Sequence, residues 1–122
     1  MSWKKAPPAL VAAFGAALPN APAVERRQMF GYPCAFARGL MFAGLHEDRC
    51  VVRLGDRKRE ALLAVLGAKP FVALGRTMRE YVVVPPSMVS DPRALGRCMR
   101  DALAYVLTLP AKPPRKPRKK RA

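Results

Sequence analysis

One stretch, residues 29–54, constrains the fold more than any other part of the sequence. Its apolar residues are interrupted twice by polar pairs suited to two-residue hairpin loops, Arg38-Gly39 and Glu47-Asp48. Three short strands joined by such loops form an antiparallel meander. We therefore predict a meander over this stretch and expect the rest of the chain to pack against it.

The two loops also predict how the strands pair. They place Phe36 opposite Met41 and Leu45 opposite Cys50. Because successive side chains point to opposite faces of a strand, one face is wholly apolar and is predicted to be the core. That face carries Cys34, Phe36, Met41, Ala43, Leu45, Cys50, Val52 and Leu54. The mixed face carries Ala35, Ala37, Leu40, Phe42, Gly44, His46, Arg49, Val51 and Arg53.

An amphipathic helix is predicted before the meander, because Leu10, Phe14 and Leu18 recur at helical spacing and Pro19 follows them. The same segment also has the features of a signal peptide, with basic residues first, an apolar stretch next and small residues around Pro22. We favour the helix, since its apolar residues form one stripe.

Two more helices and a strand are predicted after the meander. Asp56 has the character of an N-cap and Gly67 that of a left-handed stop. Residues 79–84 are strand-like, and residues 69–76 are predicted as a loop. Asp91-Pro92 is typical of a helix start. The apolar stripe of this last helix is Leu95, Met99, Ala102, Leu103, Val106 and Leu107.

The resulting order, αβββαβα, predicts an α+β domain over residues 1–110, with helices covering one face of an antiparallel sheet. Residues 111–122 form a basic tail rich in proline and are predicted to be disordered. Within the 122 residues no run of 18 or more apolar residues occurs, so no spanning helix is predicted. The three cysteines are expected to be reduced, which favours a cytoplasmic setting.

The charge of the chain, +15, is concentrated at one end. Seven of the 23 basic residues lie between Lys112 and Arg121, and no acidic residue accompanies them. Such a distribution favours polyanionic partners, DNA or RNA above all, although it also improves solubility.

Several short motifs together resemble the N-terminal domain of the TfoX/Sxy family. They are Arg26–Gly31 (RRQMFG), Leu40–His46 (LMFAGLH), Val51–Leu54 (VVRL), Gly75–Pro85 (GRTMREYVVVP) and Ala102–Val106 (ALAYV). The resemblance implies a bacterial cytoplasmic α+β protein without known catalytic residues. Named members regulate natural competence through transcription and carry a second, helical domain. This sequence has a basic tail in that place, and is more similar to short, single-domain relatives.

The tail is the first candidate site, as a tether to nucleic acid. Its cations are Lys112, Arg115, Lys116, Arg118, Lys119, Lys120 and Arg121. If all seven neutralised phosphates on duplex DNA, binding would weaken with salt with a slope of about −6. The alternative is a tail that only aids solubility.

The mixed sheet face is the second candidate, as an interaction surface formed by Phe42, His46, Arg49 and Arg53. A base could stack on Phe42 beside the two arginines. More plainly, long arginine stems could shield a half-exposed face, or the face could bind a protein partner or a second copy of the chain.

We expect no metal, no cofactor and no enzyme activity. His46 is the only histidine, and the predicted register places it on the face opposite Cys34 and Cys50, which argues against a mixed metal site or a cysteine nucleophile. The sequence thus predicts a non-enzymatic accessory or regulatory protein tethered to nucleic acid by its tail. The alternative is a protein-interaction module that uses the mixed face.

Overall fold

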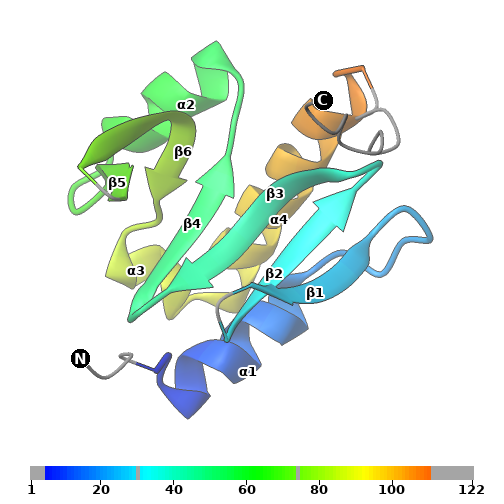
Figure 1. Ribbon diagram of the computed structural model, residues 1–122. Coiled ribbons are helices and arrows are strands. Elements are labelled where there is room, and N and C mark those ends of the chain that lie inside the picture. Colours follow the sequence, from blue (N-terminus) through cyan, green and yellow to red (C-terminus); the bar gives the residue numbers. More distant parts are fainter. Residues whose placement is uncertain (1–4, 30, 74, 111–122) are drawn as a thin grey trace, which may run out of the picture.

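A six-stranded antiparallel sheet with the strand order β1-β2-β3-β4-β6-β5 forms the centre of the molecule (Figure 1). The computed structural model describes residues 5–29, 31–73 and 75–110. Its strands are β1 (Glu25–Met29), β2 (Tyr32–Ala37), β3 (Leu40–His46), β4 (Arg49–Arg53), β5 (Lys69–Ala73) and β6 (Arg76–Val83). Its helices are α1 (Pro8–Ala17), α2 (Asp56–Leu63), α3 (Pro86–Val89) and α4 (Pro92–Leu107). The predicted α+β class is confirmed.

Both predicted hairpin loops are present. Ala37 pairs with Leu40 across the first loop, and His46 pairs with Arg49 across the second. Arg38 and Gly39 both have positive φ, 54° and 82°, as a tight turn between twisted strands requires. The β3–β4 register is also as predicted, with Leu45 opposite Cys50.

The predicted pairing of β2 with β3 is wrong beyond its first two pairs. Phe36 faces Met41 as expected, but the next pair joins Ala35 to Ala43, so Phe42 is an extra residue in a β-bulge. One extra residue exchanges the two faces for the part of the hairpin beyond it. Phe42 is therefore fully buried in the core with Ala35 and Ala37. The side chains predicted to be core at Cys34, Phe36 and Met41 belong to the opposite face.

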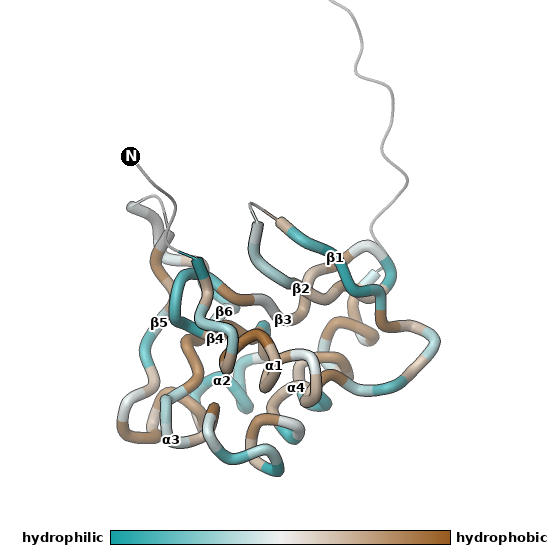
Figure 2. Tube along the Cα trace, turned by 90° about the horizontal axis from the view of Figure 1, so that it is seen from below, coloured by the Kyte–Doolittle hydropathy of each residue, from teal (hydrophilic) through white to brown (hydrophobic). Residues whose placement is uncertain are grey.

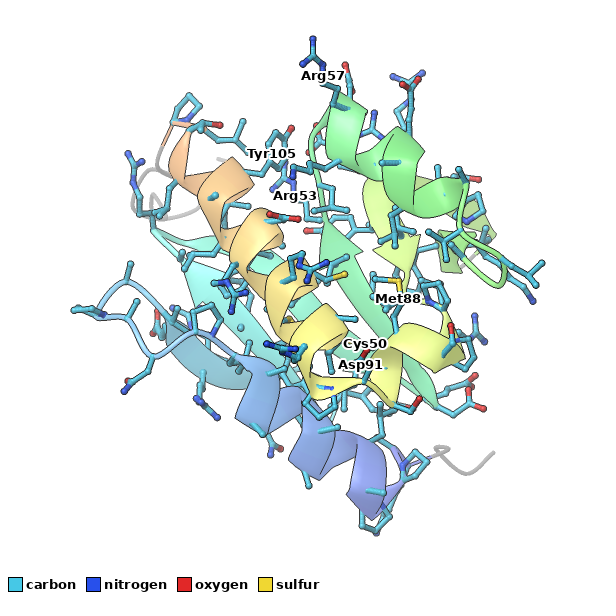
Figure 3. The ribbon with its side chains drawn as sticks, turned by 180° about the vertical axis from the view of Figure 1, so that it is seen from behind. Cys50, Arg53, Arg57, Met88, Asp91 and Tyr105 are labelled. Carbon is cyan, nitrogen blue, oxygen red and sulfur yellow. The ribbon has the colours of Figure 1, made fainter. Side chains whose placement is uncertain are left out.

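Helix α4 covers the middle of the sheet and contacts β2, β3 and β4 (Figure 3). Its start is the predicted one, because the Asp91 carboxylate accepts hydrogen bonds from the backbone N–H groups of Arg93 and Ala94. The predicted stripe is buried except for Leu107, which is 39% exposed. In the described part of the chain no helix is both long and apolar enough to cross a membrane.

The two earlier helices follow the predictions in part. Helix α1 packs on α4 and β3, and its Phe14 is buried. Helix α2 is shorter than predicted because it ends at Leu63, and Leu66 beyond it is 94% exposed. Its N-cap is Gly55 and makes no side-chain capping hydrogen bond, so the expected cap at Asp56 is wrong.

Three elements were not predicted: the edge strands β1 and β5, and the short helix α3. All five residues of β1 are exposed, so no apolar alternation marks the strand. Strand β5 contains Pro70, which lacks a donor and is tolerated at a sheet edge. The predicted loop over residues 69–76 is instead the β5–β6 hairpin.

Candidate binding groove on the helix-free sheet face

The face of the sheet opposite α1 and α4 is concave. In Figure 2 the β1–β2 and β5–β6 hairpins stand on either side of this face, and the helices lie beyond the opposite face. Between the hairpins lies an open groove of about 820 Å³, called the sheet groove below. It is lined by Met29, Phe36, Gly39, Leu40, Met41, Arg53, Phe71, Met78, Tyr81, Leu109 and Pro110.

A small apolar cluster separate from the main core supports the β5–β6 side of the groove. Val51 of β4 pairs with Val83 of β6, and both pack with Phe71 from β5. Tyr81 lies against this cluster and is only partly buried. The cluster gives one wall of the groove a packed base, so its aromatic side chains are held in place without a covering helix.

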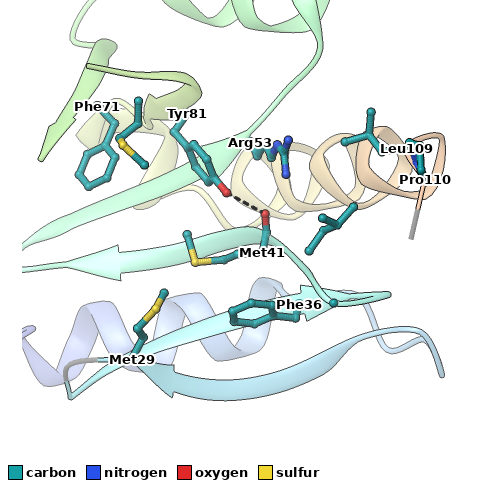
Figure 4. Close-up of a pocket in the computed structure, with 11 residues that line it drawn as sticks. Met29, Phe36, Met41, Arg53, Phe71, Tyr81, Leu109 and Pro110 are labelled. Atoms are coloured by element: carbon teal, nitrogen blue, oxygen red, sulfur yellow. Dashed lines mark hydrogen bonds between the residues drawn. The ribbon is translucent and has the colours of Figure 1, made fainter. Parts of the chain in front are cut away.

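Methionine side chains make much of the exposed apolar surface of the groove. Met29 comes from the β1 side and Met78 from the β5–β6 side, and they are 39% and 40% exposed. Met41 lies between the two walls (Figure 4). Methionine is flexible and polarizable, so surfaces rich in it adapt to varied apolar partners.

Arg53 is the charged residue of the groove lining, at the end where Leu109 and Pro110 lie (Figure 4). Its Nε donates to Glu80 Oε1 at 2.6 Å, and the hydroxyl of Tyr105 donates to Glu80 Oε2 at 2.8 Å. The guanidinium carbon lies 5.8 Å from the Tyr81 ring centroid and 6.0 Å from that of Tyr105. One carboxylate and two rings therefore fix the position of the guanidinium.

The same contacts set the protonation of this cluster. Burial would raise the pKa of Glu80, but the hydrogen bonds from Arg53 and Tyr105 outweigh it, and the pKa is lowered. The pKa of Tyr105 is raised by burial and by its bond to the Glu80 carboxylate. At neutral pH the cluster thus consists of an ionised glutamate, an arginine cation and a neutral tyrosine.

Two further contacts position the tyrosines. The Tyr81 hydroxyl donates to the backbone carbonyl of Met41 at 3.1 Å, which links β6 to β3 across the groove (Figure 4). A Cβ added at Gly55 would lie 2.9 Å from two atoms of the Tyr105 ring. The glycine before α2 is therefore required for the ring to stand beside Glu80.

The sequence matches the family model described as the TfoX N-terminal domain over residues 16–105. The chain belongs to this family. The match includes α4 up to Tyr105 and all six strands, so it contains most of the groove. No curated protein and no solved structure matches the chain significantly.

In this TfoX N-terminal domain the four residues predicted for the mixed face do not form one surface. The prediction that Phe42 lies on the mixed face is wrong. Phe42 has no exposed surface and lies under the helices, because the bulge turns it to the core. His46 lies between the rings of Tyr32 and Phe71, with centroids 5.7 and 5.5 Å away. Arg49 is paired with Glu47 at 3.0 Å. Of the four, only Arg53 lines the sheet groove.

The three cysteines are free and buried, but only Cys50 and Cys98 belong to the main core, so the prediction of a core thiol holds for Cys50 and not for Cys34. The predicted separation of His46 from both Cys34 and Cys50 is half right. Cys34 pairs with Gly44 and shares the face of His46, whereas Cys50 packs in the main core. Among the described residues no group of three or more histidine, cysteine, aspartate or glutamate side chains could hold a metal ion.

The seven cations of the predicted tether, between Lys112 and Arg121, lie outside the described residues. The groove residues that the sequence prediction missed are mainly Met29, Met78 and Tyr81. Tyr81 had a usable signal, since it alternates with the buried Val82 in a strand-like segment. Met29 and Met78 had no such signal in the sequence, because a single methionine can belong to a core or to an exposed surface.

Proposed function

We propose that this TfoX N-terminal domain protein is a cytoplasmic, non-catalytic accessory or regulatory factor that binds a protein partner in the sheet groove. One observation carries the proposal. A concave apolar surface is left open on one face of a sheet whose other face is closed by helices. Concave surfaces lined mostly by apolar side chains with a few polar groups are the usual form of binding sites.

The non-catalytic part of the proposal is supported by the state of the thiols. Burial and the nearby Cys98 raise the pKa of Cys50 to about 12, and burial also raises the pKa values of Cys34 and Cys98. Thiols of this kind are poor nucleophiles, since the thiolate is the reactive form. Buried free thiols also fit a reducing compartment, which supports the cytoplasmic assignment.

Nucleic-acid tethering is a second candidate function, and the charge distribution supports it. Seven basic residues follow Pro110 within a stretch that holds no acidic residue. Contacts of such a segment with phosphates are independent of sequence and are weakened by salt. In this alternative the tail concentrates the protein on DNA or RNA, where it acts in transcription.

Quantitative capture of cell proteins by the immobilised wild type and three variants of the full chain separates the two candidates. The groove form carries Met29→Gln and Met78→Gln. Its matched control carries Val65→Gln and Leu66→Gln, which also alter exposed apolar side chains but lie outside the groove lining. The tail form replaces the seven cations between Lys112 and Arg121 by glutamine.

The groove proposal expects a protein that the wild type, the control form and the tail form retain at similar levels after nuclease treatment. The groove form should lose most of it, because two of the exposed apolar contacts are replaced by polar groups. Retention that is equal for the groove and control forms would refute the proposal. Capture that depends on the tail and disappears with nuclease would establish tethering instead.

A further inference from the structure

We infer that the occupant of the sheet groove is an extended peptide segment of a partner protein, with apolar side chains for the groove walls and a carboxylate for Arg53. The inference rests on the proposed function and names the chemistry of the partner. It follows from three features: a fixed guanidinium at one end of the groove, the sign of the surrounding charge, and the apolar walls.

The guanidinium of Arg53 is prepared to bind an anion. Arginine offers five N–H donors, and Glu80 takes the one on Nε. The remaining donors belong to a planar group that is held beside the rings of Tyr81 and Tyr105. A carboxylate accepts two parallel hydrogen bonds from such a group, and little side-chain entropy is lost because the group is already ordered.

Charge complementarity favours an acidic occupant. The lining of the groove contains no aspartate or glutamate, and the Glu80 carboxylate beside it is already paired with Arg53 and Tyr105. Arg38 lies near the same end, since its Nη1 donates to the carbonyl of Leu107, next to the turn that brings Leu109 to the groove. Outside the tail segment the chain still has 16 basic and 8 acidic residues. An acidic segment is therefore attracted to this end and a basic one is repelled.

The walls favour a narrow apolar chain. The groove is a trough between two hairpins, with Met29 and Phe36 on one side and Phe71 and Tyr81 on the other (Figure 4). An extended peptide presents alternate side chains to one side, so its apolar residues can contact the walls while its last residue reaches Arg53.

Other occupants fit less well. A second copy would oppose two concave surfaces, whose apolar floors would not meet. The chain's own tail is basic, like Arg53. Nucleic acid finds little ring surface for stacking, since Phe71 is 8% exposed and the Arg27 guanidinium already lies 4.6 Å from the centre of the Phe36 ring.

The test uses two pools of octapeptides, acetylated and amidated at their ends, in which serine alternates with variable apolar residues. The final residue is glutamate in the acidic pool and glutamine in the neutral pool. Equal amounts of both are passed over the immobilised full chain, and the retained peptides are quantified by mass spectrometry. The variant Arg53→Gln tests the anchor. Arg49→Gln is its matched control, because Arg49 is on the same strand, is also paired with a glutamate and lies outside the groove lining.

We expect the acidic pool to be retained about tenfold more strongly than the neutral pool, as for a hydrogen-bonded charge pair. Arg53→Gln should abolish this preference, and Arg49→Gln should keep it. Equal retention of both pools, still sensitive to Met29→Gln/Met78→Gln, would overturn the carboxylate inference and leave the groove function standing. Failure to retain either pool, or retention insensitive to the methionine changes, would overturn both. Retention of a single-stranded oligothymidine that requires Arg53, with neither peptide pool bound, would assign the groove to nucleic acid.

Discussion

Phe36 and Phe42 lie on neighbouring strands of one hairpin, yet their side chains are on opposite faces of the sheet. Phe42 has no exposed surface and packs beneath the helices. Phe36 lines the open groove and has Arg27 over its ring. The comparison shows that residue type does not decide which side is closed. The covered face packs against the helices, and the open face leaves apolar surface uncovered in the groove.

The largest expected difference between the faces concerns these two phenylalanines. Phe42→Ala should lower the free energy of unfolding by about 3–5 kcal/mol, because it leaves a cavity in the packed core. Phe36→Ala should cost under about 2 kcal/mol, since its ring is already partly in water. Urea unfolding followed by circular dichroism measures both. Equal costs would mean that the open face is as closely packed as the covered one.

A smaller effect is expected at the start of the helix that closes the covered face. Asp91→Ala removes the hydrogen bonds to the N–H groups of Arg93 and Ala94 and should cost about 1 kcal/mol. The same unfolding measurement applies, with Asp91→Asn as a control that keeps a capping oxygen. If Asp91→Asn were as costly as Asp91→Ala, the cap would not be the reason for the loss.

The cluster of Arg53, Glu80 and Tyr105 beside the groove should contribute less to the free energy of unfolding, and its contribution should depend on pH. The folded pKa of Glu80 lies below its unfolded value, so its contribution is present above the unfolded value and is lost as pH falls through the folded one. Because its side chain is 35% exposed, solvent screening keeps the effect below about 1 kcal/mol. Glu80→Gln should therefore lower the free energy of unfolding at pH 7. Between about pH 5 and pH 3 the free energy of unfolding should fall less steeply for this variant than for the wild type. A pH profile parallel to that of the wild type would refute this role.

The smallest effect on stability is expected from the exposed groove methionines. The double change Met29→Gln/Met78→Gln should shift the free energy of unfolding by at most about 0.5 kcal/mol, since both side chains are already about 40% exposed. Differential scanning calorimetry at matched concentration checks this. A loss of several kcal/mol would show that the open face also supports the fold.

The sequence predicted the fold class, both hairpin loops and the β3–β4 register, because each had a local physical signal. In β4 the charged Arg49 and Arg53 alternate with the apolar Cys50 and Val52, so only one face of that strand could belong to the core. Residues 40–45 are apolar or glycine throughout, so their alternation is the same in either register. The bulge at Phe42 had no signal in such a run, and three of the eight residues predicted for the core face were misassigned as a result.

The site was less predictable than the fold for a similar reason. Arg53 was identified because an arginine in a short strand must lie on its exposed face. Its partner Glu80 is 27 residues away, and only the folded chain shows which carboxylate it meets. Strand β1 forms a wall of the groove through Met29, yet its other residues are charged or polar and gave no pattern.

The bulge at Phe42 has a consequence for shape as well as for burial. An extra residue increases the local twist and bends the strand that contains it. The pairing of β5 with β6 has a larger irregularity between Pro70 and Phe71, whose partners on β6 are Val82 and Met78. The two irregularities thus lie on opposite sides of the groove, and in Figure 2 both edge hairpins stand out from the plane of the middle strands. Deleting Phe42 should restore regular pairing of β2 with β3 and reduce the curvature of the groove, so core packing and the shape of the groove should change together.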